Sequence, residues 1–189
     1  MAAAIKAKVF QTENTVALAR NLIGTRLVIA PAQGEPIARR ITETEAYHGE
    51  EDLACHARRG RTARTEVMYA AGGVWYVYLC YGVHEMLNLV TGPRDRPCAV
   101  LIRGVEGLTG PGRLTRALGI DRRFNGRAAS VATGLWIEDD GFRPAPRQIL
   151  ATPRVGVDYA GPHWAGRKWR FVWPAGHDGT RHSRSSSEA

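Results

Sequence analysis

The sequence predicts a single α+β domain built on a mostly antiparallel, curved β-sheet with short helices at its flanks. Short segments rich in β-branched and aromatic residues recur along the 189-residue chain, separated by Gly, Pro or polar residues. Most connections between them are short, which favours hairpins over the helical crossovers that parallel strands require. The chain has no internal repeat and no linker-like stretch, and its length suffices for one hydrophobic core.

Two segments carry helix signals. Residues 12–22 have apolar side chains at three-to-four spacing and end before Gly24. Residues 111–118 begin with Pro111, which suits the first position of a helix, and end before Gly119. We therefore expect two short helices, one near the start of the chain and one after its middle.

The expected strands are apolar or alternating segments bounded by turn residues. Tyr81 and Gly82 separate two of these segments, which we therefore expect to form a protruding β-hairpin. We expect the folded domain to cover residues 1–176 and the polar residues 177–189 to be disordered. The expected strands are residues 26–30, 37–47, 74–80, 84–90, 98–102, 134–138 and 148–159.

Composition favours a polyanionic partner, because the formal net charge is +8. The basic residues are arginines apart from three lysines, and four arginines gather in the loop 58–65, where they could clamp a phosphate backbone. Three dispersed cysteines without a Cys-x-x-Cys pattern argue against a disulfide framework. No apolar run has the length of a membrane span or a signal peptide, so we expect a cytoplasmic protein with no membrane association.

The strand expected at 37–47 carries two glutamates. Alternation places Glu43, Glu45 and Tyr47 on one face, together with Arg39 and Ile41. Two carboxylates so close repel each other, which raises one pKa and allows separate acid and base roles. The alternative is a solvent-facing strip whose glutamates pair with arginines. Alternation does not say which glutamate would do chemistry.

Several motifs follow one another along the chain: ITETEAY at 41–47, CHARRGRT at 55–62 and YVYLCYG at 76–82, followed by Asn88. AVLIR at 99–103, TGPGRL at 109–114 and PRVGV at 153–157 continue the series. In order and length these motifs resemble the alkyladenine (3-methyladenine) DNA glycosylases, from about residue 17 to residue 173. Cys55, Ala63 and Trp75 depart from the family pattern, which leaves the detailed base preference open.

The resemblance implies a monomeric DNA repair enzyme that needs no cofactor and no metal. Such an enzyme hydrolyses the N-glycosidic bond of alkylated or deaminated purines flipped out of double-stranded DNA: 3-methyladenine, 7-methylguanine, hypoxanthine or ethenoadenine. The hairpin would then lie at the DNA-binding face. The chain has only Lys6, Lys8 and Lys168 to offer as an amine nucleophile, none of them near the motifs, so we expect a monofunctional enzyme that uses water.

The resemblance also assigns roles by position. Glu45 would activate the attacking water, with Arg103 and Tyr76 beside that water. Tyr47 and His56 would pack on one face of the flipped base and Tyr78 on the other, and Asn88 would screen the base at the pocket floor. Tyr81 would wedge into the minor groove. The backbone contacts expected from the basic loop are Arg58, Arg59, Arg61 and Arg64.

Two other functions fit parts of the same pattern. A non-catalytic nucleic-acid-binding module would use the same aromatic and basic surface but would leave Glu45 unexplained. A glycoside hydrolase could use Glu43 and Glu45, although its neutral sugars would not require so basic a chain. A metal site at His56 is disfavoured, because no second Cys or His follows at ligand spacing. Release of free base from alkylated DNA separates these possibilities.

Overall fold

The structure is a computed structural model and describes residues 2–177. It is a single α+β domain around a curled antiparallel sheet, which confirms the predicted fold class. The expected disorder of 177–189 falls, apart from His177, outside the described residues. Among residues 2–177, no helix is both long and apolar enough to cross a bilayer.

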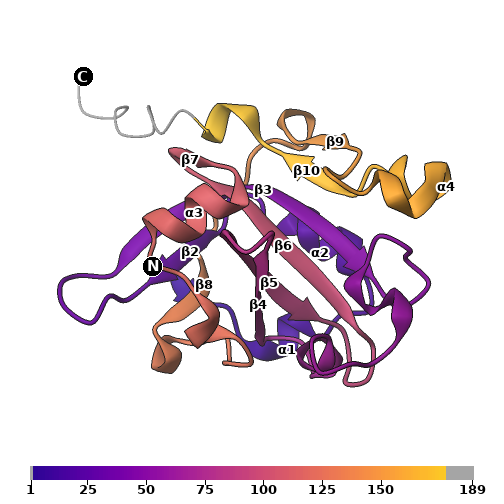
Figure 1. Cartoon of the computed structure of the whole chain (residues 1–189). Helices are drawn as coiled ribbons and strands as arrows, with labels where there is room; N and C mark the ends of the chain where they lie inside the picture. The colour runs from indigo at the N-terminus through magenta and orange to yellow at the C-terminus, as the bar shows by residue number, and fades with distance from the viewer. Residues whose placement is uncertain (1, 178–189) are drawn as a thin grey trace.

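The longest strand, β3 (Ile37–His48), organises the sheet. Its first residues pair with β2 (Arg26–Ile29), and the remainder pairs with β6 (Cys98–Val105). Beyond β6 come β5 (His84–Thr91) and β4 (Trp75–Cys80), and Figure 1 shows these strands side by side through the middle of the molecule. Short strands complete the sheet: β1 (Ala3–Ala4), β7 (Leu108–Thr109), β8 (Leu135–Asp139), β9 (Leu150–Thr152) and β10 (Arg170–Val172).

The helices are short and lie around the sheet (Figure 1). The first expected helix begins only at Thr15, because the Asn14 side chain accepts the Ala17 N–H and caps it. The second begins at Pro111, as predicted. Two further helices were not expected, because each has few residues over which periodicity could be recognised. The helices are α1 (Ala7–Phe10), α2 (Thr15–Asn21), α3 (Pro111–Ala117) and α4 (Gly161–Ala165).

The expected strand 148–159 is wrong beyond β9. Pro153 has no N–H to donate to a neighbouring strand, and Gly156 adopts a positive φ of 73°. A 3₁₀ turn, Asp158–Ala160, follows instead. The basic loop 58–65 likewise starts inside a 3₁₀ turn, His56–Arg59. Strand β10 was not expected, because its pairing with β3 is a contact between distant segments.

The two faces of the sheet have different occupants. Trp75 and Val77 of β4 lie in the main hydrophobic core, and the Trp75 indole N–H donates to the Leu135 carbonyl over 2.9 Å. Tyr76 and Tyr78 point to the opposite face, into a smaller cluster. Successive side chains of β4 from Trp75 to Tyr78 therefore alternate between the two faces of the sheet, as expected for a strand.

Alternation fails in β3. The register against β6 shifts between Ile41 and Glu43 and shifts back between Glu43 and Thr44, so both strands are irregular at the same place. Ile41 consequently lies in the main core together with Ala46, although strict alternation would put an odd-numbered and an even-numbered residue on opposite faces. Arg39 pairs with the core residue Leu27, so it lies on the same face of the sheet as Ile41. The prediction that Ile41 and Arg39 share a face with Glu45 is wrong, because this irregularity intervenes.

Candidate active site

A cavity of about 650 Å³ opens beside the face of the sheet opposite the main core. Side chains from β3, β4, β5 and β6 reach it, and so do the segments around His56 and Val155. The structure therefore gathers residues that lie up to about a hundred positions apart in the chain. The predicted site residues that line it are Tyr47, His56, Arg64, Tyr76, Tyr78, Tyr81, Asn88 and Arg103.

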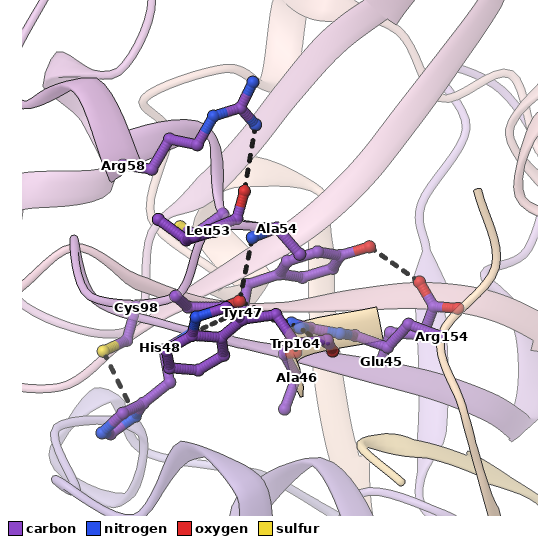
Figure 2. A network of polar contacts seen from close by, with 12 residues as sticks. Glu45, Ala46, Tyr47, His48, Leu53, Ala54, Arg58, Cys98, Arg154 and Trp164 are labelled. Carbon is purple, nitrogen blue, oxygen red and sulfur yellow. Dashed lines mark hydrogen bonds and ion pairs between the residues drawn. The ribbon is translucent and has the colours of Figure 1, made fainter. Parts of the chain in front are cut away.

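The Glu45 carboxylate is completely buried and does not itself line this cavity, but groups that do line it hold the carboxylate. The Tyr47 hydroxyl and the Val155 backbone N–H each donate a hydrogen bond of 2.8 Å, and Arg103 lies at 3.5 Å. Figure 2 shows the Tyr47 hydroxyl directed at Glu45. Burial raises the pKa of Glu45, and the Arg103 charge, the Val155 N–H and Tyr47 offset this only in part.

The neighbouring carboxylate, Glu43, has a different environment. The Nε atoms of Arg103 and Arg170 donate to the same Glu43 oxygen over 2.8 and 2.6 Å. Burial alone would raise the pKa of Glu43, but the two arginines outweigh burial and lower it. The two glutamates therefore differ: Glu43 is an ion-paired anion, whereas Glu45 is a buried carboxylate that ionises less readily than an ordinary glutamate.

The cavity has an aromatic wall. The ring centroids of His56 and Tyr78 are 4.5 Å apart, and those of Tyr76 and Tyr78 are 5.3 Å apart. The Nδ1 atom of His56 lies 3.1 Å from the Tyr76 hydroxyl. Burial, reinforced by the charges of Arg64 and Arg58, lowers the pKa of His56 to about 4. The imidazole is therefore neutral at physiological pH and has one further ring nitrogen to offer.

Asn88 is almost fully buried beside this wall, with 4% of its surface exposed. Its amide nitrogen donates to the backbone carbonyls of Tyr76 and Met86, each over 3.1 Å. Both N–H groups are thereby occupied, which fixes the orientation of the amide.

The four arginines of the basic loop have unequal surroundings. Arg61 pairs with Asp95 at 2.6 Å and with Glu66 at 3.4 Å. Arg58 donates to the Leu53 carbonyl and lies over the Tyr159 ring. The Arg64 guanidinium lies 5.3 Å from the centre of the Tyr78 ring at the cavity, and Arg59 is exposed. Arg59 and Arg64 are thus the members of this loop with the least internal compensation of their charge.

Tyr81 lies at the turn between β4 and β5, where Cys80 pairs with His84. Its side chain is 94% exposed, and its backbone adopts a φ of 49°, which is uncommon for a residue other than glycine. A large exposed ring on a left-handed backbone position lacks a packing explanation, so a role in contacting another molecule fits better.

Sequence reasoning missed three residues that shape the site: Asp52, Arg154 and Val155. Asp52 and Arg154 form an ion pair in which both side chains are fully buried, and Val155 supplies the N–H that binds Glu45. The PRVGV motif contains Arg154 and Val155, so it could have pointed to both. Nothing in the local sequence predicts that Asp52 pairs with Arg154, which lies 102 positions away. Within residues 2–177, no three His, Cys, Asp or Glu side chains are arranged to hold a metal ion.

Comparison with known proteins gives a consistent result. The model of a family described as methylpurine-DNA glycosylase (MPG) matches residues 9–109 and 107–177. A protein of Psychrobacter cryohalolentis is 43% identical over 190 residues, covering 84% of this chain and 87% of the relative. A protein of an Anaeromyxobacter species is 47% identical over 174 residues, covering 88% and 87%. Both bear the name "Putative 3-methyladenine DNA glycosylase".

Proposed function

Because this chain belongs to the methylpurine-DNA glycosylase family, and is thus a DNA glycosylase of base excision repair, we propose that it hydrolyses the N-glycosidic bond of alkylated and deaminated purines. The purine would be flipped out of double-stranded DNA into the aromatic cavity, and water would be the nucleophile. The observation that carries this proposal is the Glu45 carboxylate, held behind the cavity by Tyr47, Val155 and Arg103.

In this proposal Glu45 acts on water and on the sugar. As the base leaves, positive charge develops on the sugar, and a nearby carboxylate stabilises it. A carboxylate has about four acceptor positions, and Tyr47, Val155 and Arg103 supply three donors. The fourth position would accept the attacking water, which must pass the groups that line the cavity because Glu45 itself is fully buried. The raised pKa makes Glu45 a better proton acceptor than an ordinary glutamate, which suits a general base.

The aromatic wall would bind the base. Stacking on Tyr47, Tyr78 and His56 contributes about 1–3 kcal/mol per base, which offsets the few kcal/mol needed to unstack it. A cationic base such as 3-methyladenine gains further cation–π attraction. If the Tyr76 hydroxyl donates to Nδ1 of the neutral His56, Nε2 carries the hydrogen and can donate a hydrogen bond to an acceptor atom of the base.

The chain would leave the DNA strand intact. A glycosylase that also cuts the strand commonly uses an amine nucleophile, and no lysine is among the residues that line the cavity. Lys6, Lys8 and Lys168 are the only lysines of the sequence.

Incubation with methylated duplex DNA tests this function. We expect free 3-methyladenine, identified by mass spectrometry, an intact strand with an abasic site, and no effect of a chelator. Binding without base release would favour the nucleic-acid-binding alternative, and cleavage of simple glycosides would favour the glycoside hydrolase. Strand nicking trapped by borohydride would contradict monofunctional hydrolysis.

The rate should depend on pH through Glu45 and not through His56. The pKa of Glu45 lies above its ordinary value of 4.5, so the rate should rise with pH through that raised value and then level off. With a pKa of about 4, His56 is already neutral and adds no descending limb near 6.5. Single-turnover release of 7-methylguanine against pH, corrected for spontaneous loss, measures this. A descending limb that His56→Gln removes would show that the imidazolium is the working form.

Binding should weaken steeply with salt. Three or four phosphate contacts from the basic loop predict a slope of log affinity against log salt between about −2.7 and about −3.6, the smaller value if Arg61 keeps its own carboxylates. Replacing Arg59 and Arg64 by Gln should reduce the slope by about 1.8. Arg143→Gln, which alters an arginine paired with Asp139 outside the loop, is the control. An unchanged slope in the double variant would mean that the loop is only solvated.

Tyr81→Ser should preserve the fold and the excision of bases in mismatched pairs, but should slow excision from stably paired lesions. The exposed ring would fill the gap left by a flipped base, and this contribution matters most where extrusion is costly. Val83→Ser is the matched control, because Val83 is exposed on the same turn. Base release at saturating enzyme and thermal melting are measured together. Equal loss on both substrates with a lower melting temperature would identify Tyr81 as a packing residue.

A further inference from the structure

The buried Asp52–Arg154 ion pair has no role in the chemistry proposed so far. The guanidinium and the carboxylate are bidentate, with N–O distances of 2.5 and 2.9 Å, and neither side chain is exposed. Arg154 also donates to the carbonyls of Ala46, over 2.9 Å, and Trp164, over 3.2 Å. Four of its five N–H donors are therefore used, and all four fix backbone or carboxylate oxygens in place.

Asp52 connects the same pair to two more segments. Its oxygens accept the backbone N–H groups of His48 and Ala54 over 3.2 and 3.0 Å. His48 ends β3, and Ala54 lies two residues before His56 of the aromatic wall. The ion pair thus ties the end of β3 to the segment that carries His56.

Arg154 also reaches the groups that hold Glu45. Its guanidinium carbon lies 4.9 Å from the centre of the Tyr47 ring, and the next residue, Val155, donates to Glu45. Ala46, whose carbonyl Arg154 binds, lies between Glu45 and Tyr47 in the chain. Figure 2 shows Arg154, Tyr47 and Glu45 within one polar network. Arg154 therefore contacts or adjoins two of the three donors to Glu45: its guanidinium packs on the Tyr47 ring, and Val155 follows it directly in the chain.

Stability alone is a weak reason for such a pair. The cost of removing two charges from water can exceed their attraction, and well-packed apolar side chains of similar volume often stabilise a core as well. Orientation is a stronger reason, because a bidentate pair permits little angular freedom.

We propose that Asp52 and Arg154 are positioning residues, which set Tyr47 and the Val155 N–H against Glu45 and so fix the direction of the catalytic carboxylate. This proposal rests on the proposed function. It adds to that function a determinant of rate that contacts neither the base nor the sugar.

Two variants test it. Arg154→Lys keeps the charge but loses the bidentate fork, and Asp52→Leu with Arg154→Met removes both charges while keeping an apolar core. In each we expect the single-turnover rate per folded molecule to fall about 100-fold, as for a misplaced catalytic group, with little change in affinity for lesion DNA. The double variant should also move the rising limb of the pH–rate profile to higher pH, because displacing the Tyr47 hydroxyl and the Val155 N–H removes two hydrogen bonds that lower the pKa of Glu45.

Arg40→Lys is the matched control, since Arg40 also forms a bidentate pair, with Asp140, but lines no part of the cavity. It should lower the melting temperature without changing the rate. A wild-type rate and pH profile in both test variants would overturn the proposal. Failure of both to fold would also overturn it, by assigning the pair to stability.

If the unaltered protein released no base, the proposed function would be wrong. The positioning role of Asp52 and Arg154 would then be tested by structure alone. A crystal structure of Arg154→Lys with the Tyr47 hydroxyl and the Val155 N–H displaced from Glu45 would support positioning. Unchanged contacts would refute it.

Discussion

Glu45→Gln should abolish base release almost completely while leaving binding to lesion DNA intact. The substitution preserves the size of the side chain but removes the proton acceptor and the negative charge that the proposed function places beside the sugar. General acid–base catalysis contributes about 10²–10⁴-fold, and charge stabilisation adds to this, so we expect a loss of about 10³-fold or more. Single-turnover base release and a gel-shift titration with the same lesion duplex measure the two effects.

Glu43→Gln is the matched control, two residues earlier on the same strand. Glu43 touches Arg103 and Arg170 and not the cavity, so its loss should slow release by no more than about tenfold, through misorientation of Arg103. Near-normal turnover of Glu45→Gln together with an inactive Glu43→Gln would exchange the roles of the two glutamates.

Arg103→Gln should have the second-largest effect. Arg103 is the cation between the two carboxylates, 2.8 Å from Glu43 and 3.5 Å from Glu45, with only 13% of its side chain exposed. Its removal leaves two nearby buried carboxylates that repel each other, so the pKa of Glu45 should rise further. We expect about 100-fold slower release at neutral pH, partial recovery at alkaline pH, and about 3–5 kcal/mol less stability in urea denaturation.

Arg170→Gln separates the effect on Glu45 from the effect on Glu43. Arg170 donates to the same Glu43 oxygen as Arg103, over 2.6 Å, but has no hydrogen bond to Glu45. It should lower stability modestly and leave the pH–rate profile in place. If Arg170→Gln and Arg103→Gln slowed base release equally, Arg103 would act on the rate through its contact with Glu43 and not through its contact with Glu45.

Local signals predicted the parts of this molecule that depend on local chemistry. Turn residues and alternating aromatics placed β4 and β5, and Pro111 placed the start of α3. Nothing local could separate Glu43 from Glu45, because Arg103 and Arg170 arrive from strands about 60 and 127 positions away. Asp52 and Arg154 were missed for the same reason, since a buried charge is recognised only with its partner in place.

Strands β3 and β6 each have one extra residue at the same place in their pairing, and this limits which insertions and deletions the gene can accept. Ile41 pairs with Val105 and Thr44 with Ile102, so each strand contains the same number of residues between these two matched pairs. Gly104 fits closely against Thr42 and Glu43, where an added Cβ would come within 3.1 Å of the Thr42 hydroxyl. Deleting Thr42 alone would put the two strands out of step, whereas deleting Thr42 and Gly104 together would restore a regular ladder with Glu45 and Arg103 still on the cavity side. An insertion or deletion at the codon for Thr42 should therefore be tolerated only together with a matching change at the codon for Gly104.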